Sequence, residues 1–479
     1  MSRSWADELD DDYPPRSYVK IDAKEEANLL NKLKRAENEQ KGVAVAAPSP
    51  APQKTQLNES KTAQVVVQYA DPNSPLHSAK SFEELGLSKE LLRGIYEMNF
   101  EKPSKIQESA LPIILSDPPT NLIAQAQSGT GKTAAFTLGM LHRCKKEQQE
   151  PQAICIAPTR ELARQLFDNI HRMGRYTGLQ VQLVVKDENM DGRCTSQVLV
   201  GTPGPFLDAI KKRAFDPKKI QVFVLDEADV LFAMTGMLNE QSVKLKKLLN
   251  PKCQSLLFSA TFKPEVRDFA ARIVPQPCAQ ISLKVDELTI DAIQQLYIKC
   301  TEGKYKVLSD LFSYLTVGQT IIFVGKRITA VDLTEQLRRD GHTVSYICGG
   351  QEMTPAERDQ VIDEFRDAKI KVLITTNVLA RGIDIQQVML VINFDLPVEM
   401  DNGSADTENY LHRIGRSGRF GRKGIAINLV ESNDDMRLIK QIEQHYKRTI
   451  TDFPASKIDE LQQMLEQSAG EDVERRSNT

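Results

Sequence analysis

The stretch NLIAQAQSGTGKTAAFTL at residues 121–138 decides the fold class of this chain of 479 residues. It opens on a short apolar run typical of a buried strand and closes, from Ala134, on residues that favour a helix. Gly129 and Gly131 lie between the two, where the backbone can approach a phosphate closely. A strand, a glycine-rich loop and a helix in this order predict a phosphate-binding loop in a parallel α/β domain.

The residue types of this loop suit a nucleotide and its metal ion. Lys132 brings a positive charge to the β and γ phosphates, and the Thr133 hydroxyl can ligate Mg²⁺. The usual pattern opens on glycine, but Ala126 occupies that position here. We predict that the nucleotide contacts the following loop residues: Ser128, Gly129, Thr130, Gly131, Lys132 and Thr133.

Two adjacent carboxylates, Asp226 and Glu227, follow the apolar run 222–225. Alone, this acidic pair would fit an exposed turn better than a site. The phosphate-binding loop reverses that judgement, because ligands of open parallel sheets bind at the carboxyl ends of the strands. Asp226 would share Mg²⁺ with Thr133, directly or through water. Glu227 is then free to orient or deprotonate the attacking water.

A pair of arginines completes the expected catalytic set. The segment HRIGRSGR at 412–419 places Arg416 and Arg419 three residues apart, on one face if the segment is helical. Planar guanidinium groups suit a γ-phosphate, although the octapeptide alone would fit a basic surface patch. Following a phosphate-binding loop and an acidic pair, it predicts an ATPase whose arginines come from a second domain. We expect Lys132, Glu227, Arg416 and Arg419 to be catalytic.

These motifs resemble those of the DEAD-box ATP-dependent RNA helicases, in the family's order. They are FEKPSKIQ at 100–107, the loop at 126–133, PTRELA at 158–163, TPG at 202–204, DEAD at 226–229, SAT at 259–261, ARGID at 380–384 and HRIGRSGR at 412–419. The resemblance implies ATP as the nucleotide, with Phe100 stacked on adenine, Gln107 on its edge and Asp384 at the ribose. It also implies an RNA-stimulated ATPase that separates strands locally, without processive movement.

The same resemblance implies residues for RNA and for coupling. The expected RNA-binding residues are Pro158, Thr159, Arg160, Thr202, Gly204, Arg327, Arg358 and Thr376. Small residues and backbone groups of this kind grip phosphates and sugars, so we expect little sequence specificity and recognition of 2′-hydroxyls. Coupling between ATP and RNA is expected at Asp229, Ser259, Thr261 and His412. Pro205 departs from the family, where arginine often follows Thr-Pro-Gly.

Length and pattern favour two folded domains. The chain is 41% hydrophobic, and expected strands alternate with helices on both sides of 284–291. With the resemblance, this predicts an α/β fold of two tandem RecA-like parallel-sheet domains behind a largely disordered N-terminal extension. The expected boundaries are 1–75 for the extension, with a possible autoinhibitory helix at 23–38, 76–283 for the ATP-binding domain, 284–291 for the linker, 292–465 for the C-terminal helicase domain and 466–479 for a flexible tail.

Composition limits the environment and the mode of RNA binding. The net charge of −3 gives no global basic field, so RNA must be held by a local track of positive and hydrogen-bonding groups. Seven scattered cysteines indicate neither a zinc ribbon nor a redox pair and fit a reducing compartment. Without a signal peptide or an apolar span, we expect a soluble, intracellular monomer that does not insert into membranes.

Further segments resemble the nuclear-pore mRNA-export subfamily of DEAD-box helicases. They are DPNSPL at 71–76, DPP at 117–119 and the polar insert at 399–408. This resemblance implies messenger RNA, an inositol-hexakisphosphate-dependent export mediator and a β-propeller nucleoporin as partners, in the cytoplasm and at the nuclear pore. Three alternatives stay open: a general RNA-remodelling helicase in translation or decay, an RNA clamp with little turnover, and a P-loop ATPase acting on DNA or protein.

Overall fold

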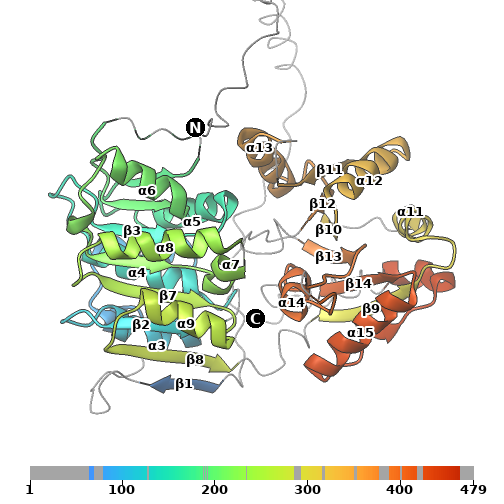
Figure 1. Ribbon diagram of the computed structural model, residues 1–479, viewed down its shortest axis with the longest axis horizontal. Helices are drawn as coiled ribbons and strands as arrows, with labels where there is room; N and C mark the ends of the chain where they lie inside the picture. Colours follow the sequence, from blue (N-terminus) through green and yellow to red (C-terminus); the bar gives the residue numbers. More distant parts are fainter. Residues whose placement is uncertain are drawn as a thin grey trace, which may run out of the picture. The chain divides into compact units, whose positions relative to one another are not determined.

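The structure of the chain is a computed structural model (Figure 1). It describes residues 64–68, 79–126, 129–186, 188, 190, 192–233, 235–284, 293–314, 319–349, 353–376, 388–399, 402–417 and 424–463. Among these residues no helix is long and apolar enough to cross a membrane. The seven cysteines all lie in the described part of the chain, are unpaired, and except for Cys144 are buried.

The first sheet has eight strands, seven of them parallel. Its strands, in spatial order, are β1 (Gln64–Gln68), β8 (Cys278–Lys284), β2 (Asn121–Gln125), β7 (Gln254–Ser259), β6 (Val222–Leu225), β3 (Ala153–Ile156), β5 (Val198–Gly201) and β4 (Val181–Val184). Only β1 runs antiparallel, paired with β8 at the sheet edge (Figure 1). The acidic pair Asp226 and Glu227 follows β6, and the glycine-rich loop follows β2. These two strands lie on either side of β7.

Helices cover both faces of this sheet because its strands are apolar on both faces. Along β2, Leu122 and Ala124 join one core and Ile123 joins the other. The first core is closed by α2 (Lys89–Glu97), α3 (Lys105–Ile114), α4 (Lys132–Arg143) and α5 (Arg160–Met173). The second is closed by α6 (Pro203–Lys211), α7 (Ala228–Ala233), α8 (Thr235–Leu248) and α9 (Pro264–Ile273). Continuous apolar strands of this type are typical of a buried parallel sheet.

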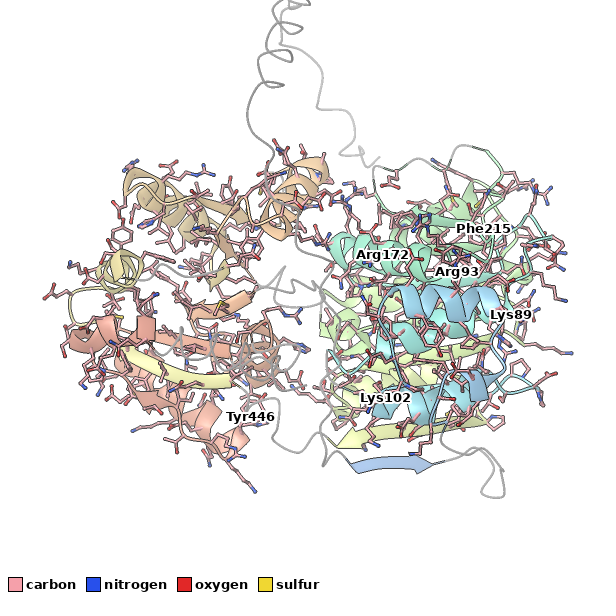
Figure 2. All side chains as sticks on the ribbon, turned by 180° about the vertical axis from the view of Figure 1, so that it is seen from behind. Lys89, Arg93, Lys102, Arg172, Phe215 and Tyr446 are labelled. Carbon is pink, nitrogen blue, oxygen red and sulfur yellow. The ribbon has the colours of Figure 1, made fainter. Side chains whose placement is uncertain are left out.

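The outer helix α2 is held to the first domain by charged and aromatic contacts. The guanidinium of Arg93, a residue of α2 labelled in Figure 2, lies 3.9 Å from the centroid of the Tyr176 ring. Arg175 forms an ion pair of 2.9 Å with Glu97. A cation over an aromatic face contributes modestly at an exposed site. These contacts complement the apolar face of α2, where Leu91 and Ile95 are buried.

The second sheet has seven parallel strands. Their order is β11 (Val344–Ile347), β12 (Val372–Thr375), β10 (Gln319–Phe323), β13 (Val388–Asn393), β14 (Gly424–Val430), β9 (Ile293–Lys299) and β15 (Thr451–Asp452). Its helices are α11 (Lys304–Tyr314), α12 (Arg327–Arg339), α13 (Pro355–Arg366), α14 (Thr407–Ile414) and α15 (Asn433–Tyr446). In β13, Leu390 and Ile392 pack with α11 and α12, whereas Val391 packs with α13. Two parallel sheets covered by helices confirm the predicted pair of RecA-like α/β domains.

Several strands were not predicted from the sequence. The apolar runs 121–124 and 222–225, which we expected as strands, lie in β2 and β6. We did not predict β1, which lies inside the expected N-terminal extension and pairs with β8 from Gln64↔Lys284 to Gln68↔Gln280. The expected helix at 23–38, the tail at 466–479 and nearly all of the linker at 284–291 lie outside the described residues.

Candidate active site

The phosphate-binding loop is fastened to the domain by two side chains at the start of α3. Ser104 Oγ donates to the Thr130 carbonyl at 2.7 Å, and Gln107 Nε2 donates to the Gly131 carbonyl at 3.0 Å. Gln107 is fully buried, and its Oε1 also accepts from the Ser104 N–H as part of a capping box. The contact of Gln107 with the loop backbone was not predicted, because nothing in the sequence indicates which groups face it.

Glycine is required at the end of this loop. Gly131 caps α4 with φ of 99°, and a Cβ built on it would lie 2.4 Å from Gln107 Nε2. At the start of the loop, glycine is not required. Ala126 still donates its N–H to the Ser259 carbonyl at 3.0 Å, continuing the pairing of β2 with β7. Its φ is not positive, so alanine is tolerated where the usual pattern has glycine.

Lys132, Asp226 and Glu227 are buried together at the carboxyl ends of β2 and β6. Their exposed fractions are 5%, 3% and 4%. Lys132 Nζ lies 4.0 Å from Glu227 Oε1, and neither Lys132 Nζ nor Glu227 Oε2 makes a hydrogen bond with any described residue. Burial, followed by repulsion from Glu227, raises the pKa of Asp226 to about 7, although Lys132 opposes this shift.

These groups have the chemistry that a magnesium nucleotide requires. A buried ammonium and a buried carboxylate without hydrogen bonds are unfavourable unless a ligand supplies partners. Around Gly129 a built Cβ meets no atom within 4 Å, so the loop borders open space on that side. Phosphate oxygens would satisfy Lys132, and a cation would relieve the repulsion between Asp226 and Glu227. The residues present therefore fit ATP and Mg²⁺.

Asp229 is joined to the segment after β7 by two hydrogen bonds. Its carboxylate Oδ2 accepts from Thr261 Oγ1 at 3.3 Å, while its backbone N–H donates to Ser259 Oγ at 3.2 Å. The same Oδ2 lies 3.7 Å from His412 Nε2. The four residues that we expected to couple ATP to RNA are thus brought together. The Ser259 hydroxyl, which accepts from the main chain of Asp229, also donates to the Thr261 carbonyl at 2.7 Å.

Comparison with known proteins agrees with this geometry. A DEAD/DEAH box helicase model matches residues 104–269, and a helicase conserved C-terminal domain model matches residues 303–421. The chain is 50% identical over 404 residues to the ATP-dependent RNA helicase DBP5 of Mycosarcoma maydis, covering 84% of this chain and 88% of that protein. The chain belongs to the DEAD-box RNA helicases. It is therefore an ATP-hydrolysing enzyme of the RNA-dependent helicase class.

Two solved structures of Saccharomyces cerevisiae Dbp5 are similar to this DEAD-box protein over most of its length. The structure bound to RNA and ADP BeF3 has a TM-score of 0.76 and 46% identity, covering 81% of this chain and 100% of that one. The structure bound to Nup159, Gle1, IP6 and ADP has a TM-score of 0.60 and 44% identity, covering 80% of this chain and 100% of that one.

The RNA-binding residues expected of a DEAD-box protein lie at the ends of strands and the starts of helices. Thr159 caps α5, accepting from the Leu162 N–H at 3.2 Å, and Arg160 begins the helix. Thr202 and Gly204 flank the start of α6, where the unexpected Pro205 fits because first-turn residues need no N–H partner. Arg327 begins α12 and is exposed, and Thr376 follows β12.

Two of these arginines already have carboxylate partners in this DEAD-box chain. Arg160 Nη2 lies 3.0 Å from Asp359 Oδ2, and its Nη1 donates to the Lys186 carbonyl at 3.1 Å. Arg358 Nε lies 2.9 Å from Glu161 Oε1. RNA phosphates would have to compete for these guanidinium groups.

The arginine segment is helical only in its first part among the described residues. Helix α14 ends at Ile414 with Gly415 as its cap, so Arg416 lies in the turn that follows. Arg416 is 3% exposed, and its Nε donates to the His412 carbonyl at 3.1 Å. Arg413, which we had not singled out, is fully buried and bonds Asn393 Oδ1 and the Asp395 carbonyl at 3.1 and 2.7 Å. Arg419, Asp384 and Ser128 lie outside the described residues.

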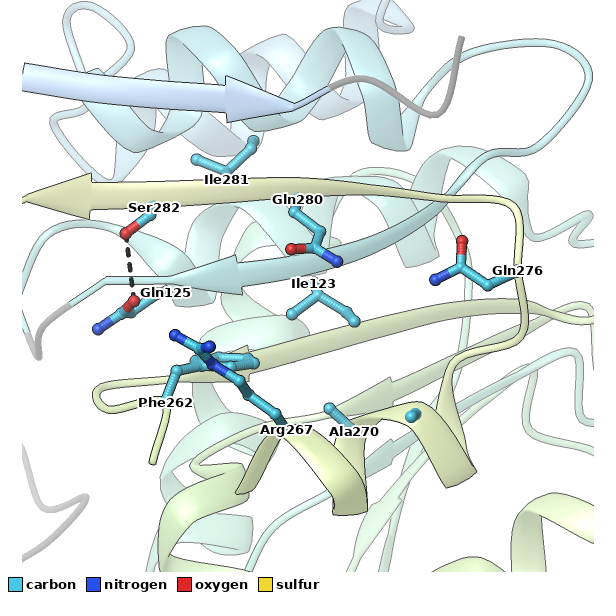
Figure 3. Close-up of a pocket in the computed structure, with 10 residues that line it drawn as sticks. Ile123, Gln125, Phe262, Arg267, Ala270, Gln276, Gln280, Ile281 and Ser282 are labelled. Carbon is cyan, nitrogen blue, oxygen red and sulfur yellow. Dashed lines mark hydrogen bonds between the residues drawn. The ribbon is translucent and has the colours of Figure 1, made fainter. Parts of the chain in front are cut away.

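A separate pocket lies on the α9 side of the first sheet (Figure 3). Its volume is about 510 Å³, and its lining includes Ile123 of β2, Gln280 and Ile281 of β8, and Arg267 of α9. Gln125 and Ser282, joined by a hydrogen bond of 3.1 Å, line its end nearest the phosphate-binding loop. Among the described residues, none of those expected to bind nucleotide or RNA lines this pocket, which sets it apart from the cluster of Lys132, Asp226 and Glu227.

Proposed function

We propose that this DEAD-box helicase is an RNA-stimulated ATPase in messenger RNA export at the cytoplasmic face of the nuclear pore. It separates short duplexes or RNA–protein contacts locally, without processive movement. The observation that carries the ATPase part is the buried set of Lys132, Asp226 and Glu227, in which Lys132 Nζ and Glu227 Oε2 have no hydrogen-bond partner among the described residues. The export part rests on similarity to Dbp5, one structure of which is bound to Nup159, Gle1 and IP6.

The residues of the first domain divide the chemistry between them. Lys132 and the loop N–H groups hold the phosphates, and Phe100 stacks on adenine. Gln107 reads the adenine edge once its amide exchanges its present bonds with the Gly131 carbonyl and the Ser104 N–H for the base. Glu227 orients the attacking water and accepts its proton. Thr133 and Asp226 would hold Mg²⁺, which neutralises phosphate charge when bound.

The second domain supplies cations late in the cycle. Arg416 and Arg419 stabilise the charge that develops on the transferred phosphate, and Asp384 holds the ribose. An arginine supplied in this way raises rates by about 10³ to 10⁵. RNA gripped by both domains brings these groups to the nucleotide, and contacts around Asp229 report its state to the RNA side.

A comparison of RNA and DNA tests the proposed substrate. Single-stranded RNA should raise the ATPase rate of the full chain, whereas DNA of the same sequence should not, because a 2′-hydroxyl reader distinguishes them. Glu227→Gln serves as the control for contaminating ATPases, since it should bind ATP but lose turnover with either polymer. Equal stimulation by DNA would favour a general P-loop ATPase, and hydrolysis limited to one turnover would favour an RNA clamp.

The assignment to export is tested with regulators. An export mediator of the Gle1 type with inositol hexakisphosphate should raise the RNA-dependent rate, and a β-propeller nucleoporin of the Nup159 type should bind the chain. Absence of both effects, with RNA stimulation intact, would favour the alternative of a general helicase in translation or decay.

The N-terminal extension is proposed to inhibit the enzyme through residues 23–38. Asp22 and Glu25 resemble a capping box, and Leu29, Leu30 and Leu33 would share one face of the helix. Deletion of residues 1–60 should therefore raise the ATPase rate measured without RNA. An unchanged rate would remove the inhibitory role.

A further inference from the structure

Asp395 lies where three elements of the second domain meet. It follows β13, the strand beside β10 (Figure 1). Its side-chain Oδ2 accepts the Gly325 N–H at 2.8 Å, and its main-chain carbonyl accepts from Arg413 Nη1 at 2.7 Å. Its second carboxylate oxygen, Oδ1, lies 3.5 Å from Lys304 Nζ. One residue thus touches the loop before α12, the end of α14 and the start of α11.

The contact of Asp395 with Gly325 lies next to Arg327, a residue expected to bind RNA. Gly325 precedes Lys326, the cap of α12, and Arg327, its first residue, and all three are exposed. Free N–H groups at the start of a helix favour anions such as phosphate. Because Asp395 holds the N–H of Gly325, it fixes where α12 begins and where Arg327 projects. A Cβ built on Gly325 would lie 3.4 Å from the same Asp395 Oδ2, so the contact is close.

The contact of Asp395 with Arg413 leads to Arg416, a residue expected to act on the nucleotide. Arg413 is 1% exposed, and its guanidinium lies 5.0 Å from the centroid of the Phe323 ring, beneath the loop that carries Gly325. Burial lowers the pKa of Arg413 to about 9. The Arg416 N–H in turn donates to the Arg413 carbonyl at 3.1 Å. A shift of Asp395 would therefore be transmitted through Arg413 to the backbone of Arg416.

We propose that Asp395 is a positioning residue that couples the RNA-facing start of α12 to the arginine segment after α14. The inference rests on the proposed RNA-stimulated ATPase, because it assigns Arg327 to RNA and Arg416 to the nucleotide. Lys304 anchors the junction. It is 9% exposed, also lies 3.4 Å from Asp435 Oδ2, and contacts Oδ1 of Asp395, whereas the Gly325 N–H bonds Oδ2.

Asp435 provides a matched control. It shares Lys304 with Asp395 and closes the capping box of α15 with Ser432, but the hydrogen bonds of its carboxylate go only to the N–H groups of Glu431 and Ser432 among the described residues. Asp435→Ala therefore removes an ion pair with Lys304 and a helix cap without touching Gly325. Asp395→Asn provides the conservative variant, since its amide oxygen can still accept the Gly325 N–H.

The test measures the ATPase rate of the full chain against RNA concentration, together with the thermal unfolding midpoint of each variant. Asp395→Ala should raise the RNA concentration for half-maximal stimulation about tenfold, the factor that a lost hydrogen bond to a charged group gives. Asp395→Asn should recover most of that loss. Lys304→Met keeps the Asp395 carboxylate but removes its ion pair, and should raise the RNA concentration for half-maximal stimulation by a smaller factor. Asp435→Ala should retain the wild-type RNA response.

The outcomes separate the possible failures. If Asp435→Ala and Asp395→Ala change the RNA response equally, the role of Asp395 is structural and the inference is overturned. If Asp395→Asn is as defective as Asp395→Ala, the Gly325 bond does not carry the effect and the inference fails. If Asp395→Ala does not fold, the inference is tested by the RNA concentrations for half-maximal stimulation of wild type, Asp395→Asn and Lys304→Met. It fails if Lys304→Met does not differ from wild type. A wild-type rate insensitive to RNA would instead defeat the proposed function itself.

Discussion

Each RecA-like domain buries a set of charged side chains, and the two sets differ in their hydrogen-bond partners. In the first, Lys132 Nζ and Glu227 Oε2 are buried without a hydrogen bond among the described residues. In the second, the buried cations Lys304 and Arg413 contact protein oxygens at 2.7 to 3.5 Å. A buried polar group without a hydrogen bond lowers the free energy of unfolding. A buried group with hydrogen bonds lowers it only when one of its partners is removed. The first domain therefore keeps groups for a ligand, and the second uses its buried cations to fix its own geometry.

The largest effect is expected from a change that separates catalysis from stability. Glu227→Gln should lower the RNA-stimulated turnover by about 10² to 10⁴, the range for a lost general base. The unfolding free energy without nucleotide should stay unchanged or rise by about 1 kcal/mol, because the substitution relieves the repulsion between Glu227 and Asp226 while Lys132 keeps Asp226 as its counter-charge. ATPase assays and urea unfolding of the full chain measure both quantities.

The exposed residue Glu240 gives the control for this substitution. Glu240→Gln should change neither turnover nor stability. A loss of stability of several kcal/mol in Glu227→Gln would mean that Glu227 supports the fold, and the contrast between the domains would fail.

A buried arginine of the second domain should behave in the opposite way. Arg413→Met leaves Asn393 Oδ1 and the Asp395 carbonyl without their donor, and should lower the unfolding free energy by about 3 kcal/mol. Arg437→Met removes only a surface ion pair with Asp434 and should change it by less than about 0.5 kcal/mol. Urea unfolding followed by circular dichroism distinguishes the two. Equal effects would show that the network around Arg413 adds nothing.

The strands around the active site could be predicted because they are apolar on both faces. Runs such as 222–225 and 255–258 are buried in the middle of the first sheet, where pattern alone identifies them. Edge strands carry a weaker signal. Strand β4, at the sheet edge, is only half buried at Val181 and Gln182, and β1 depends on its pairing with β8. Such pairing between distant segments is not encoded in local sequence.

The candidate site also contains residues that the sequence predicts and residues that it does not. Lys132, Asp226 and Glu227 were predicted because each follows a strand and carries the chemistry that a nucleotide needs. The groups that position them were not. Ser104 acts through an ordinary hydroxyl, Arg413 resembles any other arginine of its segment, and Asp395 acts through one backbone N–H. Their roles arise from tertiary contacts, which spacing along the chain does not reveal.

The next effect concerns the two glycines of the phosphate-binding loop. Both Gly129 and Gly131 have positive φ, so alanine at either position should cost about 1 kcal/mol in backbone strain. Gly131→Ala should cost about 1 to 2 kcal/mol more, because its Cβ displaces Gln107 from the loop. Gly129→Ala meets open space. Thermal unfolding without nucleotide measures the difference, and equal midpoints would show that Gln107 does not fasten the loop.

The smallest effect distinguishes a partnered hydroxyl from an unpartnered one within the first domain. Thr261 Oγ1 donates to Asp229 Oδ2 at 3.3 Å, whereas the buried Thr137 Oγ1 has no hydrogen-bond partner among the described residues. Thr261→Val should therefore lower the unfolding free energy by about 1 kcal/mol, and Thr137→Val should leave it unchanged or raise it. Only Thr261→Val should also reduce stimulation of the ATPase by RNA, because Asp229 then loses one of its links to the segment after β7. If both variants are equally stable and equally stimulated, the Asp229 contact carries no coupling, and the signal must pass through His412 or Ser259 instead.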